Sequence, residues 1–171
     1  AGDATITFSA SATAPSNPFW IGGEVNFPQY LTANSLATPD WVFVALGIND
    51  VFGQTTDAAC SAAADAEFVK LDTLIASIKA AGTGVKVGLM LPSPPSSDQD
   101  SFAANYGVGQ TRWRNKRNIV IWTRQLIAKY EGQEASRTYI VPSNTALDTV
   151  NNMSTAASGP ANSRSSVNVA R

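Results

Sequence analysis

The sequence predicts an α/β protein, a three-layer α/β/α sandwich around a parallel sheet, of which this chain holds an incomplete part. Three short apolar runs, at 41–46, 85–91 and 138–142, have the length and composition of buried strands. Stretches with helical spacing of apolar residues separate each run from the next. Strands that alternate with helices make right-handed crossovers, and we expect a parallel sheet with helices on both faces.

The chain divides into three parts. Residues 1–18 are rich in Ala, Ser and Thr, and we interpret them as a linker or the end of an inserted β-segment, with one short strand at 5–8. Residues 19–153 are expected to form the central part of the α/β domain, beginning with a short helix at 26–31. Residues 154–171, rich in Ser, Ala and Asn, are interpreted as a loop that leads to a C-terminal block outside this chain.

The first long strand and the helix after it carry most of the expected core. No polar residue interrupts the run at 41–46, so we expect this strand to be covered on both faces. A helix follows at 64–81 and ends at Gly82, and its apolar residues recur at i, i+3 and i+4 positions: Phe68, Leu71, Leu74, Ile75 and Ile78. Trp20, Trp41 and Trp122 lie in apolar surroundings and are assigned to the core.

A second long helix is expected from Thr111, a suitable N-cap, to Tyr130, with Gly132 as its end. Its first turns carry a basic cluster, for which a solvated helix face is the default interpretation: Arg112, Arg114, Lys116 and Arg117. Trp113, within this cluster, is the one tryptophan considered for stacking on a sugar.

Composition excludes several classes of function. Twelve Lys and Arg oppose 13 Asp and Glu, and the net charge of −1 gives no reason to expect nucleic acid or an anionic membrane as a partner. No apolar run approaches the roughly 20 residues of a membrane-spanning helix. Cys60, the only cysteine, is interpreted as a packing residue. The chain has no histidine, which removes His-ligated metal sites and any Ser-His mechanism completed within it, so no metal or cofactor is expected.

The strongest chemical signal follows the first long strand. In open parallel sheets, functional groups gather at the carboxyl ends of the strands. Here Gly47 permits a tight turn, and Asn49 presents a neutral amide that can stabilise a developing oxyanion. Asp50 can orient the loop by accepting backbone N–H groups. Taken alone, this Gly-X-Asn-Asp string also fits an ordinary turn.

The wider string at 39–50, Pro-Asp-Trp-Val-Phe-Val-Ala-Leu-Gly-Ile-Asn-Asp, resembles the third conserved block of the SGNH (GDSL-like) hydrolases. The resemblance extends over residues 17–153 and is to the esterase domains of phage tail proteins and to carbohydrate esterases. It implies an SGNH or flavodoxin-like sandwich and an ester hydrolase activity. It also implies that Asn49 donates to the oxyanion, with Gly47 in the same block and Asp50 in support.

Two blocks of that family have no counterpart in this sequence. The Gly-Asp-Ser nucleophile block is missing, since Gly2-Asp3-Ala4 has no hydroxyl at its third position. The Asp-X-X-His block is missing as well. A glycine N–H of the family's second block also stabilises the oxyanion, and Gly22 and Gly23 are the candidates here, with a hairpin or loop position as the alternative interpretation. We therefore expect the Ser and His to come from other parts of the same polypeptide or from a companion chain.

The leading hypothesis is an ester hydrolase, a carbohydrate O-acetyl esterase that acts on an acylated carbohydrate and is inactive without the missing blocks. The alternative is a non-catalytic saccharide-binding or structural domain of a phage tail or virion protein. The resemblance points to a virion or extracellular location and is compatible with a homo-oligomer. A nucleotide-binding domain is a weaker third hypothesis, because no strand ends in a Gly-rich phosphate loop.

Overall fold

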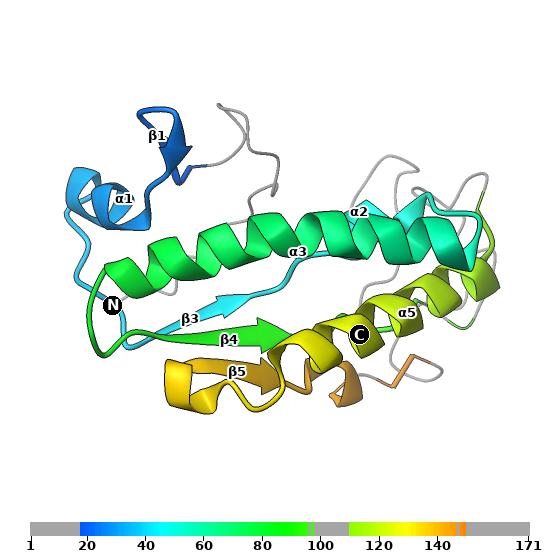
Figure 1. The fold of residues 1–171 in the computed structure, drawn as a ribbon. Coiled ribbons are helices and arrows are strands. Elements are labelled where there is room, and N and C mark those ends of the chain that lie inside the picture. Colours follow the sequence, from blue (N-terminus) through cyan, green and yellow to red (C-terminus); the bar gives the residue numbers. More distant parts are fainter. Residues whose placement is uncertain (1–17, 96, 98–109, 147, 150–171) are drawn as a thin grey trace, which may run out of the picture.

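The computed structural model describes residues 18–95, 97, 110–146 and 148–149 (Figure 1). The strand expected at 5–8 and the tail at 154–171 lie outside these residues. Three strands, β3 (Trp41–Val44), β4 (Lys86–Met90) and β5 (Thr138–Val141), form a sheet in the order β3-β4-β5. Both pairings are parallel, with Val42 opposite Val87 and Val87 opposite Thr138. The α/β class and the parallel sheet are thereby confirmed.

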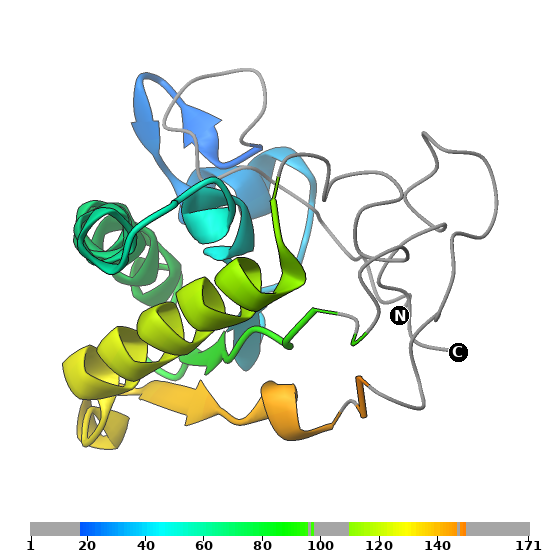
Figure 2. The same cartoon turned by 90° about the vertical axis from the view of Figure 1, so that its right-hand side faces the viewer.

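Two long helices provide the crossovers between these strands. Helix α3 (Asp57–Ala80) connects β3 to β4, and α5 (Arg112–Tyr130) connects β4 to β5. The strand order advances in one direction, so two right-handed crossovers place both helices on the same face of the sheet. There they pack against each other (Figure 2). The core between the helices and the sheet is formed mainly by residues of α3, α5, β4 and the position just before β4: Phe68, Leu71, Leu74, Ile75, Ile78, Val85, Val87, Leu89, Trp122 and Leu126.

The helix boundaries follow from their caps. Thr111 accepts a hydrogen bond from the backbone N–H of Arg114, which confirms the expected start of α5. Helix α3 begins at Asp57, seven residues before the expected position, because Thr56 caps it by accepting from the N–H of Ala59. The intervening stretch is rich in alanine, which has the highest helix propensity but leaves little apolar periodicity to detect.

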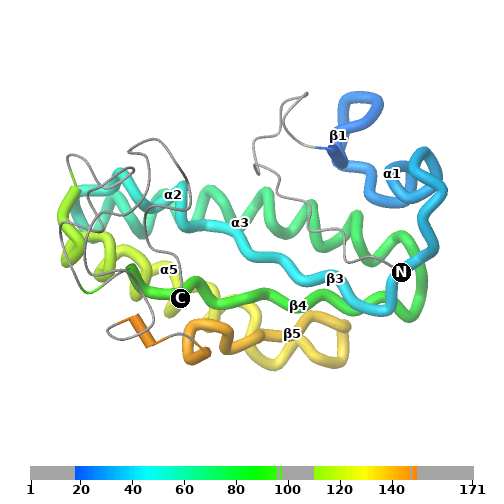
Figure 3. The backbone as a smooth tube through the Cα atoms, turned by 180° about the vertical axis from the view of Figure 1, so that it is seen from behind, coloured from blue at the N-terminus to red at the C-terminus, as the bar shows by residue number. Residues whose placement is uncertain are grey.

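The opposite face of the sheet differs from the prediction for the first long strand. In β3, Trp41 is 39% exposed and Phe43 is 58% exposed, whereas Val44 is buried. Both α3 and α5 lie on the other face of the sheet (Figure 3). Because side chains of a strand alternate between its two faces, every second residue of β3 points away from these helices. The expectation that this strand is covered on both faces is wrong, and so is the assignment of Trp41 to the core. Trp122 is buried as expected, while Trp20 is partly exposed.

A small N-terminal unit packs against the C-terminal part of α3. It consists of an antiparallel hairpin, β1 (Trp20–Ile21) and β2 (Glu24–Val25), followed by helix α1 (Phe27–Ala33). Ser77 on α3 fixes this unit, because its hydroxyl donates to the carbonyl of Val25 and accepts from the N–H of Phe27, both at 2.9 Å. The short helix expected at 26–31 is therefore confirmed.

Three short helices complete the described elements: α2 (Ile48–Phe52), η1 (Glu134–Ser136) and η2 (Ser143–Thr145). Helix α2 follows β3, and η2 follows β5, so both lie at the carboxyl edge of the sheet (Figure 1). Among the described helices, none is both long enough and apolar enough to cross a membrane.

Candidate functional site

The Gly-X-Asn-Asp string lies at the carboxyl end of β3, where the sequence places it, but it forms the start of a helix and not an open loop. Gly47 is the N-terminal cap residue of α2, and Asn49 and Asp50 belong to its first turn. The parallel strands β4 and β5 end at the same edge of the sheet. There the Ser143 hydroxyl, just after β5, donates to the carbonyl of Leu91, just after β4, at 2.8 Å. The carboxyl ends of all three strands therefore lie at one edge of the sheet, the edge at which α2 follows β3, as expected for a site of this fold.

Gly47 is required by both its backbone and its surroundings. Its φ of 105° lies in the left-handed region that favours glycine. A Cβ atom on Gly47 would lie 2.1 Å from the Cε2 and Cζ2 atoms of Trp122, a fully buried residue of α5. The backbone of Gly47, at the start of α2, thus lies directly against the Trp122 ring.

Asn49 presents a free amide at this edge. Its side chain is exposed, as is that of the neighbouring Ile48. Within the described part of the chain, no hydrogen bond occupies the Asn49 side chain. Two N–H donors of a neutral group are therefore available to a molecule bound at the carboxyl edge of the sheet.

Asp50 has a different environment from its neighbour. It is only partly exposed, and burial raises the pKa of its carboxyl, with a further increase from the negative charge of Glu67 on α3. A hydrogen bond from its own backbone N–H and the charge of Lys70 act in the opposite direction. The charged neighbours of Asp50 are thus on α3. We therefore assign Asp50 to the contact between α2 and α3 and not to the exposed edge of the sheet.

Two side chains near the start of α5 hold the other end of α2. Asn118 donates from its amide nitrogen to the carbonyls of Val51 and Gln54, both at 2.8 Å. Gln110 donates to the carbonyl of Phe52 at 2.7 Å. Neither residue was singled out in the sequence. A usable signal was present for Asn118, because it falls four residues before Trp122 and therefore lies on the buried face of α5.

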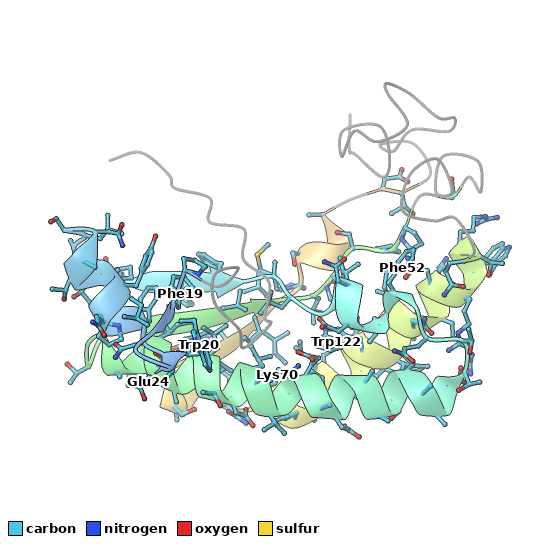
Figure 4. The ribbon with its side chains drawn as sticks, turned by 90° about the horizontal axis from the view of Figure 1, so that it is seen from above. Phe19, Trp20, Glu24, Phe52, Lys70 and Trp122 are labelled. Atoms are coloured by element: carbon cyan, nitrogen blue, oxygen red, sulfur yellow. The ribbon has the colours of Figure 1, made fainter. Side chains whose placement is uncertain are left out.

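Gly22 and Gly23 are not part of this arrangement. They form the turn of the β1–β2 hairpin, with φ values of 68° and 90°, and nothing lies within 4 Å of a Cβ built on either. The hairpin lies along the C-terminal part of α3, whereas α2 lies near the N-terminal part. In Figure 4, Phe19, Trp20 and Glu24 of the hairpin region lie at one end of the molecule, and Phe52 and Trp122 lie towards the other. The hairpin interpretation of these glycines is the correct one.

The described residues contain no cluster of His, Cys, Asp or Glu suited to a metal ion. Cys60 is fully buried, and its thiol donates to the backbone carbonyl of Asn118 at 3.5 Å. Burial raises the pKa of this thiol, which disfavours the reactive thiolate. Cys60 is therefore a packing residue, in agreement with its sequence interpretation.

The geometry defines an α/β protein with an exposed amide at the carboxyl edge of a parallel sheet. The chain matches the model of the GDSL-like Lipase/Acylhydrolase family over residues 9–112, a segment that includes Gly47, Asn49 and Asp50. No curated protein and no solved structure gave a match. Because the family match spans more than half of the sequence, the chain belongs to the GDSL-like lipase/acylhydrolase family. The general activity of this family is the hydrolysis of ester bonds, which releases the acyl group.

Proposed function

We propose that the protein is an SGNH-type serine esterase that removes acyl groups from carbohydrate, with Asn49 as an oxyanion donor. In this reaction a serine hydroxyl attacks the ester carbonyl, a histidine takes up its proton, and negative charge develops on the carbonyl oxygen. The chain has no histidine. The Ser and the Asp/His pair of the proposed mechanism therefore come from other parts of the polypeptide or from a companion chain.

The observation that carries this proposal is the unoccupied, exposed amide of Asn49 on a backbone fixed by the contact between Gly47 and Trp122. A preorganised neutral donor can bind the oxyanion without a change of protonation and without reorganisation during the reaction. Removal of one such donor typically lowers kcat by about 10²–10³-fold. In this proposal Asn49 donates a hydrogen bond to the oxyanion, and Gly47 and Asp50 hold the backbone that carries Asn49.

An exposed aromatic residue favours a saccharide as the substrate. Trp113 is 62% exposed in the first turn of α5, three residues after Gln110, which donates to the carbonyl of Phe52 at the end of α2. The guanidinium of Arg112 lies 3.9 Å from the centroid of its ring, and the Lys116 ammonium lies 5.9 Å from it. The ring face that Arg112 leaves open can stack on a sugar, and the donors beside the ring can bind the hydroxyl or acidic groups of that sugar.

The test compares ester hydrolysis by the full-length gene product and two single variants, Asn49→Ala and Trp113→Ala. We expect Asn49→Ala to lower kcat by about 10²–10³-fold for both p-nitrophenyl acetate and O-acetylated xylan. Trp113→Ala should raise KM for the polysaccharide only, since p-nitrophenyl acetate has no sugar to stack. Asn34→Ala, an exposed asparagine on the distant α1 end, is the matched control.

A fluorophosphonate probe separates the esterase from the non-catalytic alternative. One covalent adduct per active polypeptide, on a serine, is expected for the esterase. If the gene product forms no adduct and releases no acetate, yet binds the polysaccharide through Trp113, the esterase proposal is wrong and a saccharide-binding domain replaces it.

A further inference from the structure

We infer that Asn118 is a positioning residue for the Gly47–Asp50 segment, through hydrogen bonds that hold the C-terminal end of α2. This inference rests on the proposed function of Asn49. Asn118 is completely buried, with 0% of its surface exposed. A buried amide between hydrophobic helices is costly unless its donors and acceptor are all used, so its partners indicate its role.

All of the hydrogen-bonding groups of the Asn118 side chain have partners. The two amide hydrogens go to the carbonyl oxygens of Val51 and Gln54, at 2.8 Å each. The amide oxygen accepts from the Nε of Arg114 at 2.8 Å. Arg114 is held in turn by Asp57, the first residue of α3, whose carboxylate lies 2.7 Å from its Nη1. The orientation of the amide is therefore determined from both sides.

Helix α2 needs this external support because of its length. It has five residues, far fewer than the roughly 12–15 that an isolated helix needs for stability in water. Beyond its last turn, the carbonyl of Val51 accepts from the backbone N–H groups of Gly53 and Gln54, the latter at 3.2 Å. Asn118 supplies donors to the carbonyl of Val51 within α2 and to that of Gln54 just beyond it.

The two ends of α2 rest on the same face of α5. Gly47, at the start of α2, contacts the Trp122 ring, and Val51, near its end, bonds to Asn118 one helical turn earlier. Asn49 lies between these two attachments. A change at Asn118 therefore lets the short helix pivot on its Gly47 contact and displaces the Asn49 amide. Misplacement by about 1 Å can reduce a rate by about 10²-fold.

The experiment uses Asn118→Asp in the full-length gene product. The carboxylate has the shape of the amide but cannot donate to the two carbonyls. Gln125→Leu is the matched control, since Gln125 ties α5 to Ser61 and Asp65 on α3 but has no bond to α2. Asn118→Ser is a milder second variant in case the aspartate prevents folding, since a hydroxyl can donate to only one carbonyl.

Two activity readouts separate positioning from folding. With p-nitrophenyl acetate, we expect kcat to fall by about 10–100-fold in the Asn118 variants with little change in KM, because the oxyanion contact acts mainly in the transition state. Fluorophosphonate should still label the same fraction of molecules as in the wild type, but more slowly. Gln125→Leu should lose stability and keep its kcat per labelled site.

Hydrogen exchange gives a readout that does not depend on activity. Amides in the peptide covering 47–54 should exchange at least about tenfold faster in the Asn118 variants than in the wild type or Gln125→Leu. Unchanged exchange at 47–54 would overturn the inference, as would a loss of activity fully explained by a smaller labelled fraction. A wild type without esterase activity contradicts the proposed function only, and exchange then decides the role of Asn118 alone.

Discussion

Gly47 shows how one residue fixes the position of the candidate site. Its left-handed backbone and its contact with Trp122 both exclude a side chain. We expect Gly47→Ala to lower the free energy of unfolding by about 2–5 kcal/mol, the sum of about 1–2 kcal/mol for the left-handed conformation and about 1–3 kcal/mol for overpacking. Urea denaturation of the wild type and the variant measures the difference.

Gly53, at the other end of α2, is the matched control. Its φ is −78°, and nothing lies within 4 Å of a Cβ built on it. Gly53→Ala should be neutral or slightly stabilising, because alanine lowers the entropy of the unfolded chain without strain. Equal losses of stability in Gly47→Ala and Gly53→Ala would contradict the special requirement for glycine at position 47. Gly47→Ala combined with Trp122→Leu should cost less than the sum of the two single changes, since the smaller side chain relieves the clash.

At the same scale, the sequence indicates some site residues and not others for a physical reason. Gly47 and Asn49 are detectable because a turn glycine and a strand-end position are local features. The function of Asn118 depends on carbonyls 67 and 64 residues away in the chain. Such a contact exists only after α2 and α5 have packed, so helical periodicity could place Asn118 on a buried face but could not name its partners.

At the scale of elements, Asp57 links the N-termini of the two long helices. Its carboxylate bonds to Arg117 and Arg114, and these two partners hold the pKa of Asp57 well below its usual value. A carboxyl whose pKa is lower in the folded state stabilises that state above its unfolded pKa of 3.8, and the contribution is lost as the pH falls through the folded value.

We therefore expect Asp57→Asn to be less stable than the wild type at neutral pH. The gap in the free energy of unfolding should stay constant down to about pH 5 and shrink below pH 3.8, as the wild-type carboxyl becomes protonated in the unfolded state. High salt should also reduce it, because the side chains of Asp57 and Arg117 are 45% and 63% exposed. Denaturation at several pH values checks this, and a gap independent of pH and salt would show that the charge of Asp57 is not the cause.

The types of the long elements could be predicted from the sequence, but some of their boundaries could not. The sequence predicts the start of α5 correctly because Thr111 caps a strongly periodic stretch. The start of α3 is not predictable in the same way, because its alanines have high helix propensity but produce no apolar periodicity. The Gly-X-Asn-Asp segment was expected as a loop, and its helical form depends on tertiary contacts with α5 that no local pattern records.

At the scale of the whole molecule, the parallel sheet was predictable but the coverage of its faces was not. An apolar run such as β3 is typical of a strand buried on both sides. In the described residues both crossover helices cover one face, and the other face carries an aromatic cluster. Trp41 stacks on Phe43 with ring centroids 5.7 Å apart and contacts Tyr139 at 4.9 Å. Part of the apolar run of β3 therefore lies on the face of the sheet that α3 and α5 do not cover.

This aromatic face leads to the last expectation, which concerns association of the chain with itself. Contiguous exposed aromatic groups promote contact between molecules, and β3 pairs only with β4 among the described strands. The 171-residue chain should therefore associate with increasing concentration in sedimentation velocity, and Phe43→Thr should weaken the association while preserving a residue suited to a strand. Val69→Thr is the control, because Val69 is 66% exposed but lies on α3, away from the cluster. A wild-type chain that stays monomeric at every concentration would show that this face has no tendency to bind another copy. Equal effects of Phe43→Thr and Val69→Thr would show that general surface hydrophobicity, and not the aromatic face, causes the association.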